Sequence, residues 1–302
     1  MSVENPLLKV MLGSDLPVNV KYPLLCSFKY DGVRSSVQRE QFYARSLKPI
    51  RNKFIQQFAH PLYNNLDGEL VVGKVNEEAT FRRSTSGVMS THGEPEFTFQ
   101  VFDCLTLDQP YKLRYQALQD WFDHSTLPHW LQLIEHRWIN SYSELEAMLR
   151  EALDNGYEGI VARDPEAKYK HGRATAKGGQ LMRWVPWETA EAMVYAFEEG
   201  MHNTNEAEVN ELGNTHRSTD ADGMVPSGRL GAFLVTDIVT GVNFKVGNGK
   251  GMTHEFCTHV WENQSRYINK TLKYSHKVVG GYDKPRQAQF VGWRDPIDLG
   301  GG

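Results

Sequence analysis

The chain has 302 residues, of which 40% are hydrophobic and 23% charged, and its formal net charge is −4. This length favours two domains, and the composition excludes a chain that is disordered throughout. Cys26, Cys104 and Cys257 are odd in number and widely spaced, which excludes a disulfide framework or a CxxC zinc site and fits a cytoplasmic protein. No segment resembles a secretory signal or approaches the ~18 apolar residues of a membrane span, so we expect neither export nor membrane insertion.

Alternating apolar and polar residues predict an antiparallel, strand-rich first part of the chain. Four segments share this alternation: residues 24–30, 33–38, 66–72 and 97–105. The segment 84–96 is rich in turn residues, so we expect a loop there. Apolar residues at helical spacing predict helices over 113–124 and 141–156, and Ser141 or Ser143 can cap the second one.

The last third of the chain predicts a small all-β unit. Its expected elements are a hairpin with a Thr-Gly turn, a short helix and two further strands: residues 228–249, 252–263, 271–279 and 286–293. About five strands and one helix are the content of an OB-type barrel. We therefore predict an α+β domain with antiparallel sheets over residues 1–190, followed by an all-β OB-fold domain over residues 191–302.

The negative net charge argues against a nucleic-acid partner, but the charges are unevenly distributed. Residues 266–294 combine lysine and arginine with tyrosine, phenylalanine and tryptophan, as nucleic-acid-binding surfaces do. Within this segment Lys273, Lys277 and Arg286 are candidate nucleic-acid contacts. Acidic residues gather instead in residues 198–212, which we expect to form a polar loop. Either charge run is equally consistent with a solvated surface.

Lys29 lies at the end of the first predicted strand, in the sequence SFKYDGVR. The two-residue period of a strand places it on one face with Ser27 and Asp31, and places Phe28 and Tyr30 on the other face. A lysine in an apolar setting can lose its proton, and only the neutral amine attacks a carbonyl or a phosphorus. Lys29 is therefore a candidate nucleophile, although KYDG alone fits a surface lysine beside a turn better.

Four further motifs follow KYDGVR in a fixed order. They are LDGEL at 66–70, FTFQVFD at 97–103, GYEGIVAR at 156–163 and QLMRW at 180–184. With these motifs the chain resembles the covalent nucleotidyltransferase superfamily and, within it, the small phage-type ATP-dependent DNA ligases. The resemblance extends from Lys21 to Arg294 and is densest between Cys26 and Trp187. It implies a nucleotidyltransferase (adenylation) domain followed by the OB-fold domain.

The resemblance also implies roles for four basic residues. Lys29 would displace pyrophosphate from ATP and hold AMP as a phosphoramidate. Arg34 would contact the ribose or the nick phosphate, and Arg173, in YKHGR, would be a second cation on the nucleotide. Arg45, in YARS, would bind the 5′-phosphate of the nick, although a lone strand arginine is more often a surface cation.

The last motif departs from the pattern of the resembled ligases. They usually carry Lys-x-Lys where this chain reads Arg183-Trp184-Val185, so the second cation is missing. Because an arginine does not give up its proton, Arg183 would act on the α-phosphate of ATP only as a fixed charge. One phosphate contact of the family is therefore in doubt in this chain.

Two glutamates complete the implied site. Glu69, in DGEL, would hold a ribose hydroxyl or a metal-bound water, and Glu158, in YEGIVAR, would bind Mg²⁺, which prefers carboxylate and phosphate oxygens. Each glutamate lies beside a glycine, Gly68 or Gly159, where a neighbouring backbone or a ligand can come close. A solvated strand end is the alternative interpretation of each carboxylate.

Phe102 is out of place on its predicted strand. Phe97, Phe99 and Val101 share the face that should be core, whereas Phe102 lies on the opposite, mainly polar face. An aromatic ring on that face either covers a neighbouring helix or stacks on a purine. The resemblance places the adenine of ATP there, and a base stacks well on an aromatic ring.

As a whole, the resemblance implies an enzyme that uses ATP and Mg²⁺ to seal nicks in double-stranded DNA. AMP would pass from ATP to Lys29 and then to the 5′-phosphate, and the 3′-hydroxyl would displace it. The expected protein is a two-domain monomer in the cytoplasm, without a separate N-terminal DNA-binding domain and without a membrane partner.

Other classes of protein share part of this pattern. An RNA ligase or an mRNA-capping guanylyltransferase uses the same lysine chemistry, and a capping enzyme would use GTP. A non-catalytic OB-type binder of single strands would need the C-terminal aromatics but would leave residues 26–184 unexplained. A Schiff-base lysine enzyme would need neither the metal-binding glutamates nor the phosphate-binding cations.

Overall fold

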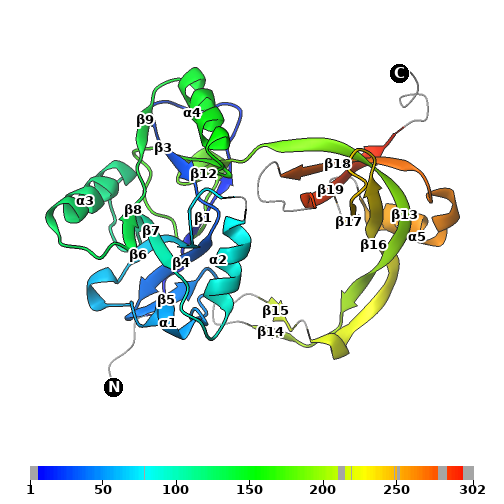
Figure 1. Ribbon diagram of the computed structural model, residues 1–302, viewed down its shortest axis with the longest axis horizontal. Helices are drawn as coiled ribbons and strands as arrows, with labels where there is room; N and C mark the ends of the chain where they lie inside the picture. The colour runs from blue at the N-terminus through cyan, green and yellow to red at the C-terminus, as the bar shows by residue number, and fades with distance from the viewer. Residues whose placement is uncertain are drawn as a thin grey trace. The chain divides into compact units, whose positions relative to one another are not determined.

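The computed structural model describes residues 6–77, 79–209, 215–218, 220–247, 249, 252–277 and 284–294. The chain divides into two compact units, Met1–Pro186 and Trp187–Gly302, called unit 1 and unit 2 below (Figure 1). The sequence predicts the boundary between the domains after residue 190. Among the described helices, none combines the length and the apolar character needed to span a bilayer.

Within its described part, unit 1 contains two five-stranded sheets. The β3 sheet has the order β2-β12-β10-β3-β9, formed by Ser14–Asp15, Met182–Trp184, Gly159–Arg163, Leu24–Lys29 and Arg137–Ile139. The β6 sheet has the order β5-β4-β6-β7-β8, formed by Gln41–Ala44, Val33–Gln38, Leu66–Val72, Phe97–Cys104 and Leu131–Leu133. Separately, β1 (Met11–Leu12) pairs in parallel with β11 (Gly172–Arg173).

Each sheet of unit 1 buries one face in its own apolar core. The β3 sheet contributes Leu24, Cys26, Ile160, Ala162 and Met182 to a core with α4 (Tyr142–Asp154). The β6 sheet contributes Val37, Leu66, Leu70, Phe99 and Val101 to a second core. Because side chains alternate along a strand, the opposite faces carry Lys29 on one sheet and Glu69 on the other. We call these two surfaces the Lys29 face and the Glu69 face.

The longer helices of unit 1 agree with the sequence prediction at two places and differ at one, and a short helix, α1 (Lys53–Gln56), lies where the sequence predicts none. Helix α3 (Tyr111–His124) and helix α4 lie where apolar spacing predicts them, and the Ser141 hydroxyl caps α4 by accepting from the amide of Glu144. The segment expected as a loop instead begins inside α2 (Thr80–Met89). Ser84 of this helix is fully buried and accepts a 3.0 Å hydrogen bond from the amide of Val72, so a contact with β6 overrides the turn preference of its sequence.

The described residues of unit 2 form a five-stranded barrel, with an α-helix between two of its strands, β17 and β18. The order is β17-β16-β13-β18-β19, formed by Asn243–Val246, Met224–Asp237, Trp187–Asn203, Thr271–Lys277 and Arg286–Trp293. Helix α5 (His254–Glu262) follows β17. A parallel bridge between Gly247 and Gln289 joins the outer strands, so the sheet closes on itself. This strand order and closure confirm the predicted OB-type all-β fold.

The acidic stretch of unit 2 is partly strand, which corrects the predicted loop. Glu198 and Glu199 belong to β13 and pair with β16, and β14 (Ala207–Val209) pairs with β15 (Thr215–Arg217). Residues 210–214 lie outside the described residues. A strand shows alternating apolar residues in its sequence only where one of its faces is buried. Residues 198–203 of β13 include no buried residue, so their sequence does not predict a strand.

Candidate active site

Lys29 and Glu158 form an ion pair at the start of β10. Lys29 ends β3, its register partner is Gly159 of β10, and the amide of Glu158 donates a 3.2 Å hydrogen bond to the carbonyl oxygen of Lys29. The Nζ of Lys29 contacts the carboxylate of Glu158. The lysine side chain is 25% exposed and the glutamate side chain 1%, so a ligand can reach the amine while the carboxylate stays buried behind it.

The glycines beside the two glutamates let neighbouring backbone come close. Gly159 has φ +152°, and a Cβ there would lie 2.2 Å from the carbonyl oxygen of Trp184. A Cβ on Gly68 would lie 2.6 Å from the carbonyl oxygen of Gln100. The backbone that comes close to each glycine therefore belongs to an adjacent strand. Strand packing thus requires glycine at both positions.

Arg34 is fixed on the Glu69 face by a buried carboxylate. Its Nε and Nη2 donate to the two oxygens of Asp67 at 2.7 and 2.8 Å, and the hydroxyl of Tyr169 donates to the same carboxylate at 2.6 Å. Its Nη2 also lies 3.3 Å from the carbonyl oxygen of Met11. Burial alone would lower the pKa of Arg34, but the charge of Asp67, its hydrogen bond and the charges of Tyr169 and Glu69 together outweigh burial and raise the pKa, so Arg34 is a permanent cation.

Glu69 connects the two sheets electrostatically. It lies opposite Arg34 in the β4–β6 register. Burial raises its pKa to about 7, while the positive charges of Lys29 and Arg34 oppose that rise and the charge of Glu158 adds to it. Lys29 ends a strand of the other sheet, Glu158 directly precedes β10, and Arg163 of β10 pairs with Asp103 of β7, so the Lys29 face and the Glu69 face approach one another. The candidate site lies between them.

Phe102 lies on the Glu69 face, as the sequence predicts, and is 8% exposed. The β6–β7 register shifts at this residue, since Val101 pairs with Gly68 and Asp103 with Asp67. The Cζ of Arg34 is 4.3 Å from its ring centroid, and the Cζ of Arg163 is 5.4 Å from it. Two guanidinium groups therefore contact this ring, as cation–π pairs do. The ring belongs to the candidate site, and a stacking base would share it with these cations.

Arg183 lies on the Lys29 face. Val161 of β10 is the register partner of both Ser27 on β3 and Arg183 on β12, so these side chains project on the same side as Lys29. Arg183 is exposed, and its Nε donates to the Asp15 carboxylate at 2.9 Å. The arrangement suits a fixed positive charge, with Asp15 as the group that holds it.

Arg45 and Arg173 are exposed at the margins of unit 1. Arg45 lies in the turn after β5, not within a strand; the preceding Ala44 pairs with Ser35, so Arg45 lies at the same end of the β6 sheet as Arg34. Arg173 is in β11, in register with Leu12 of β1. The structure brings neither residue into the Lys29–Glu158 pair.

The predicted DNA contacts of unit 2 lie together on one side of the barrel. Lys277 of β18 is in register with Arg286 of β19, and Lys273 lies on the same side of β18 by the two-residue period. Unit 2 therefore carries a cluster of basic side chains, which we call the β18–β19 basic face. It consists of Lys273, Lys277 and Arg286.

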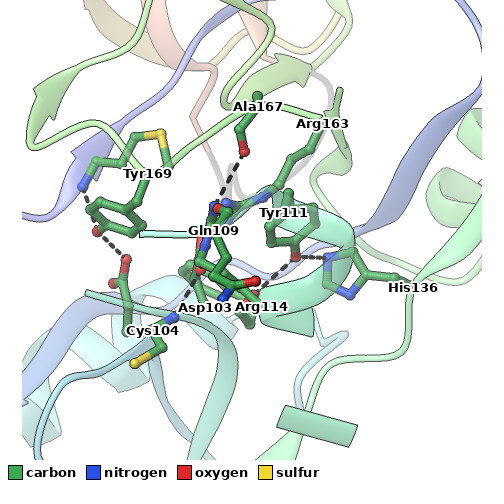
Figure 2. Close-up of polar contacts among 12 residues, drawn as sticks. Asp103, Cys104, Gln109, Tyr111, Arg114, His136, Arg163, Ala167 and Tyr169 are labelled. Atoms are coloured by element: carbon green, nitrogen blue, oxygen red, sulfur yellow. Dashed lines mark hydrogen bonds and ion pairs between the residues drawn. The ribbon is translucent and has the colours of Figure 1, made fainter. Parts of the chain in front are cut away.

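Sequence reasoning missed the residues that hold the site together. Asp67 and Tyr169 fix Arg34, and Asp103 forms a buried cluster with Arg114 and Arg163, as Figure 2 shows. Four of these five residues lie inside segments that the sequence analysis quotes: Asp67 in LDGEL, Asp103 in FTFQVFD, Arg163 in GYEGIVAR and Tyr169 in YKHGR. The sequence contains these residues in recognisable segments, but a single sequence does not show which of the side chains contact one another.

The described residues contain no group of three or more histidine, cysteine, aspartate or glutamate side chains arranged to hold a metal ion. Glu158 pairs with Lys29, and Glu69 interacts with the charge of Lys29; both carboxylates have oxygens that suit Mg²⁺. Mg²⁺ keeps waters and binds through one or two carboxylates together with substrate phosphates. The donor set therefore fits Mg²⁺ that arrives with a nucleotide, and does not fit a cage built from protein alone.

Two known proteins with similar sequences are described as a DNA ligase and a probable DNA ligase. A DNA ligase of Fowlpox virus is 25% identical over 182 residues, 54% of this chain and 30% of that protein. A probable DNA ligase of Streptomyces griseus is 26% identical over 200 residues, 59% of this chain and 39% of that protein. These matches cover well under half the length of either relative.

Solved structures match over nearly the whole chain. The Chlorella virus DNA ligase-adenylate superposes with a TM-score of 0.51 at 26% identity, covering 96% of this chain and 100% of that one. A Lig E DNA ligase shares the fold, with a TM-score of 0.72 at 21% identity, 96% of this chain and 100% of that one. The family described as "ATP dependent DNA ligase domain" matches residues 16–178, and this chain belongs to that family.

Proposed function

We propose that this chain is an ATP-dependent DNA ligase that seals nicks in double-stranded DNA through an AMP intermediate on Lys29. The observation that carries the proposal is the Lys29–Glu158 ion pair between two sheet faces that also bring Arg34 and Glu69. An accessible amine among fixed cations and buried carboxylates suits attack on a phosphorus. Membership of the ligase family identifies ATP as the nucleotide.

In the first step the Nζ of Lys29 attacks the α-phosphorus of ATP. A nitrogen–phosphorus bond forms, the bond from the α-phosphorus to the bridging oxygen breaks, and pyrophosphate leaves. The proton lost by the amine has the Glu158 carboxylate as its nearest acceptor. Arg183, on the same face, stabilises the negative charge on the phosphate oxygens. It takes the place of the first lysine of the Lys-x-Lys pattern, and Val185 leaves the second position without a cation.

The two carboxylates have a further role in this proposal. Glu69 and Glu158 would hold Mg²⁺ together with the phosphates of ATP, and the ion would neutralise charge on the phosphoryl group that is transferred. Arg34, fixed by Asp67, would contact the ribose or the nick phosphate without any rearrangement of its own. Phe102 would carry the adenine, with its ring orientation set by the guanidinium groups that already contact it.

The later steps involve DNA. AMP passes from Lys29 to the 5′-phosphate of the nick, and the 3′-hydroxyl then attacks that phosphate and releases AMP. Arg45, exposed at the end of the β6 sheet, is the candidate for the 5′-phosphate, and Arg173 is a second cation near the nucleotide. The β18–β19 basic face would contact the duplex through its phosphates, so we expect no sequence preference. We also expect the enzyme to be a monomer.

The test is incubation of the protein with Mg²⁺ and either α-labelled ATP or α-labelled GTP, followed by a denaturing gel and then by addition of a nicked duplex. We expect label from ATP to stay on the protein, to be absent in Lys29→Ala, and to leave the protein as the nick is sealed. Lys112→Ala, which removes an exposed lysine of α3, should label as the wild type does. Label from GTP alone would support a capping enzyme, and no label from either nucleotide would refute the proposal.

A further inference from the structure

Three buried charged side chains meet at the end of β7. Asp103 follows Phe102 directly, and its carboxylate accepts hydrogen bonds from the Nε and Nη2 of Arg114 at 2.8 and 3.1 Å. The Nη1 of Arg163 pairs with the same carboxylate. All three side chains are at most 1% exposed. Figure 2 shows Asp103 beside the guanidinium group of Arg114, which also reaches backbone oxygens of Gln109 and Ala167.

This cluster connects the two sheets that border the candidate site. Arg163 lies on β10, four positions beyond the register partner of Lys29, and Asp103 lies on β7 beside Phe102. The Arg163–Asp103 pair therefore joins the strand that pairs with the nucleophile's own strand to the strand that carries the aromatic ring. Arg114 anchors the same carboxylate to α3.

Phe102 is fixed from two sides by the same cluster. The Cζ of Arg163 is 5.4 Å from its ring centroid. Its carbonyl oxygen lies 2.9 Å from the hydroxyl of Tyr111, which in turn lies 2.8 Å from Nε2 of His136. The guanidinium of Arg163 is also 4.3 Å from the centroid of the Tyr111 ring. Arg163 thus contacts the ring of Phe102 directly and its backbone only through Tyr111, and Figure 2 shows the arrangement of Tyr111, His136 and Arg163.

Stability alone explains this cluster poorly. Two arginines share one carboxylate, and the Nε of Arg163 is buried without a hydrogen-bond partner among the described residues. Leaving a buried donor unpaired costs free energy, and buried ion pairs are often no more stabilising than apolar side chains of similar volume. What such a cluster does supply is a fixed geometry.

We propose that Arg163 is a positioning residue for nucleotide binding: through Asp103 it holds Phe102 and the β6 sheet at the distance from Lys29 that a bound adenylate requires. The adenine must lie on Phe102 while its α-phosphate reaches Lys29, so the separation of these two residues decides whether one nucleotide can meet both. This inference rests on the proposed function, because that proposal assigns the adenine to Phe102 and the nucleophile to Lys29.

The test measures the ATP dependence of AMP–lysine formation in Arg163→Met, Arg163→Lys and Asp103→Asn. We expect the KM for ATP to rise about tenfold or more in Arg163→Met, in line with the strength of base stacking, and the rate at saturating ATP to change much less. Arg163→Lys keeps the charge and should recover part of the loss. In the Lys29→Ala background, titration calorimetry with a non-hydrolysable ATP analogue should show the same loss of affinity.

The control is Lys112→Met, which removes an exposed ion pair between α3 and Glu166 in the segment after β10. This pair connects nearly the same elements without touching Phe102, so the KM for ATP should not change. Thermal unfolding of each variant separates a folding defect from a binding defect.

A double-mutant cycle with Phe102→Leu tests whether Arg163 acts through the ring. We expect Arg163→Lys to add little to the KM of Phe102→Leu. If the effects of the two substitutions on KM simply add, the residues are not coupled and the inference is overturned. A KM within about twofold of the wild type in folded Arg163 variants would overturn it as well. If Arg163→Met does not fold, Arg163→Lys and the double-mutant cycle carry the test. A wild-type protein that takes no label from ATP would instead refute the proposed function.

Discussion

At the scale of single residues, Asp67 organises more of the site than any residue singled out from the sequence. Its fully buried carboxylate accepts two hydrogen bonds from Arg34 and one from Tyr169. The hydroxyl of Tyr169 also accepts from the amide of Met11, so the same group ties down a distant segment. A carboxylate with these partners keeps the guanidinium of Arg34 in one orientation.

Removing this charge should therefore be costly. We expect Asp67→Asn to lower the free energy of unfolding by about 3 kcal/mol or more, because it leaves the charge of Arg34 uncompensated. Tyr169→Phe removes the hydrogen bond to the same carboxylate and the one from the amide of Met11, and should cost about 2 kcal/mol. Urea unfolding of both variants measures the difference, and equal losses would show that the charge of Asp67 is not what stabilises Arg34.

Gly159 makes a second prediction at this scale. A Cβ there would lie 2.2 Å from backbone, whereas a Cβ on Gly172, which has φ +95°, would meet nothing within 4 Å. Both positions have positive φ, so the comparison isolates the clash. We expect Gly172→Ala to cost about 1 kcal/mol and Gly159→Ala about 3 kcal/mol or more by urea unfolding. A similar cost at both positions would show that the β10–β12 approach can relax.

At the scale of elements, local patterns predict structure where one face is buried. Helices α3 and α4 and the strands β3, β4, β6 and β7 follow their apolar periods. The same period predicts Phe102 on the Glu69 face. Helix α2 and the outer part of β13 were missed, because Ser84 is satisfied by a tertiary hydrogen bond and the outer part of β13 has no buried face.

The candidate site likewise contains residues that local sequence patterns predict and contacts that only the fold reveals. The motifs identify Lys29, Glu69 and Glu158 because each motif is a local pattern. They do not reveal that Asp15 pairs with Arg183 or that Arg34 covers Phe102, since these contacts join segments that meet only in the fold. Arg45 was expected in a strand and lies in a turn, one residue beyond the end of β5.

His136, between β8 and β9, makes the pH dependence of folding testable. Burial and the charge of Arg163 lower its pKa to about 3, whereas an unfolded histidine has a pKa of about 6.5. Between these values the unfolded chain binds a proton that the folded chain does not, so stability is lost as the pH falls through this window.

Replacing this histidine should flatten the profile. We expect the free energy of unfolding of His136→Gln to lose a slope of up to about 1.4 kcal/mol per pH unit between about pH 6 and 4, relative to the wild type. His92→Gln, at an exposed position, is the control and should leave the slope unchanged. Chemical unfolding at several pH values measures both, and an unchanged slope in His136→Gln would show that this histidine does not cause the loss of stability.

At the scale of the whole molecule, the two units divide the proposed work. The lysine chemistry lies within unit 1, and the β18–β19 basic face lies within unit 2. The net charge of −4 conceals this division, because acidic residues elsewhere balance the basic segment. Changes in unit 2 should therefore affect DNA binding and leave AMP transfer to Lys29 intact.

We expect Lys273→Ala combined with Lys277→Ala to weaken binding to nicked DNA at low salt and to leave labelling by ATP unchanged. Each phosphate contact that is lost should reduce the slope of log affinity against log salt by about 0.9. Fluorescence anisotropy at several salt concentrations measures the slope. Lys245→Ala, on β17, is the matched control and should keep the wild-type slope.

The candidate site can form only late during synthesis, because its contacts join residues that lie far apart in the sequence. Met11 meets Tyr169 across 158 residues, Lys29 meets Glu158 across 129, and Asp15 meets Arg183 across 168. Pairings at such sequence distances form late, because long loops must close first. During translation the early strands must wait for β10 and β12, so a nascent chain released before Arg183 should be unable to take AMP from ATP.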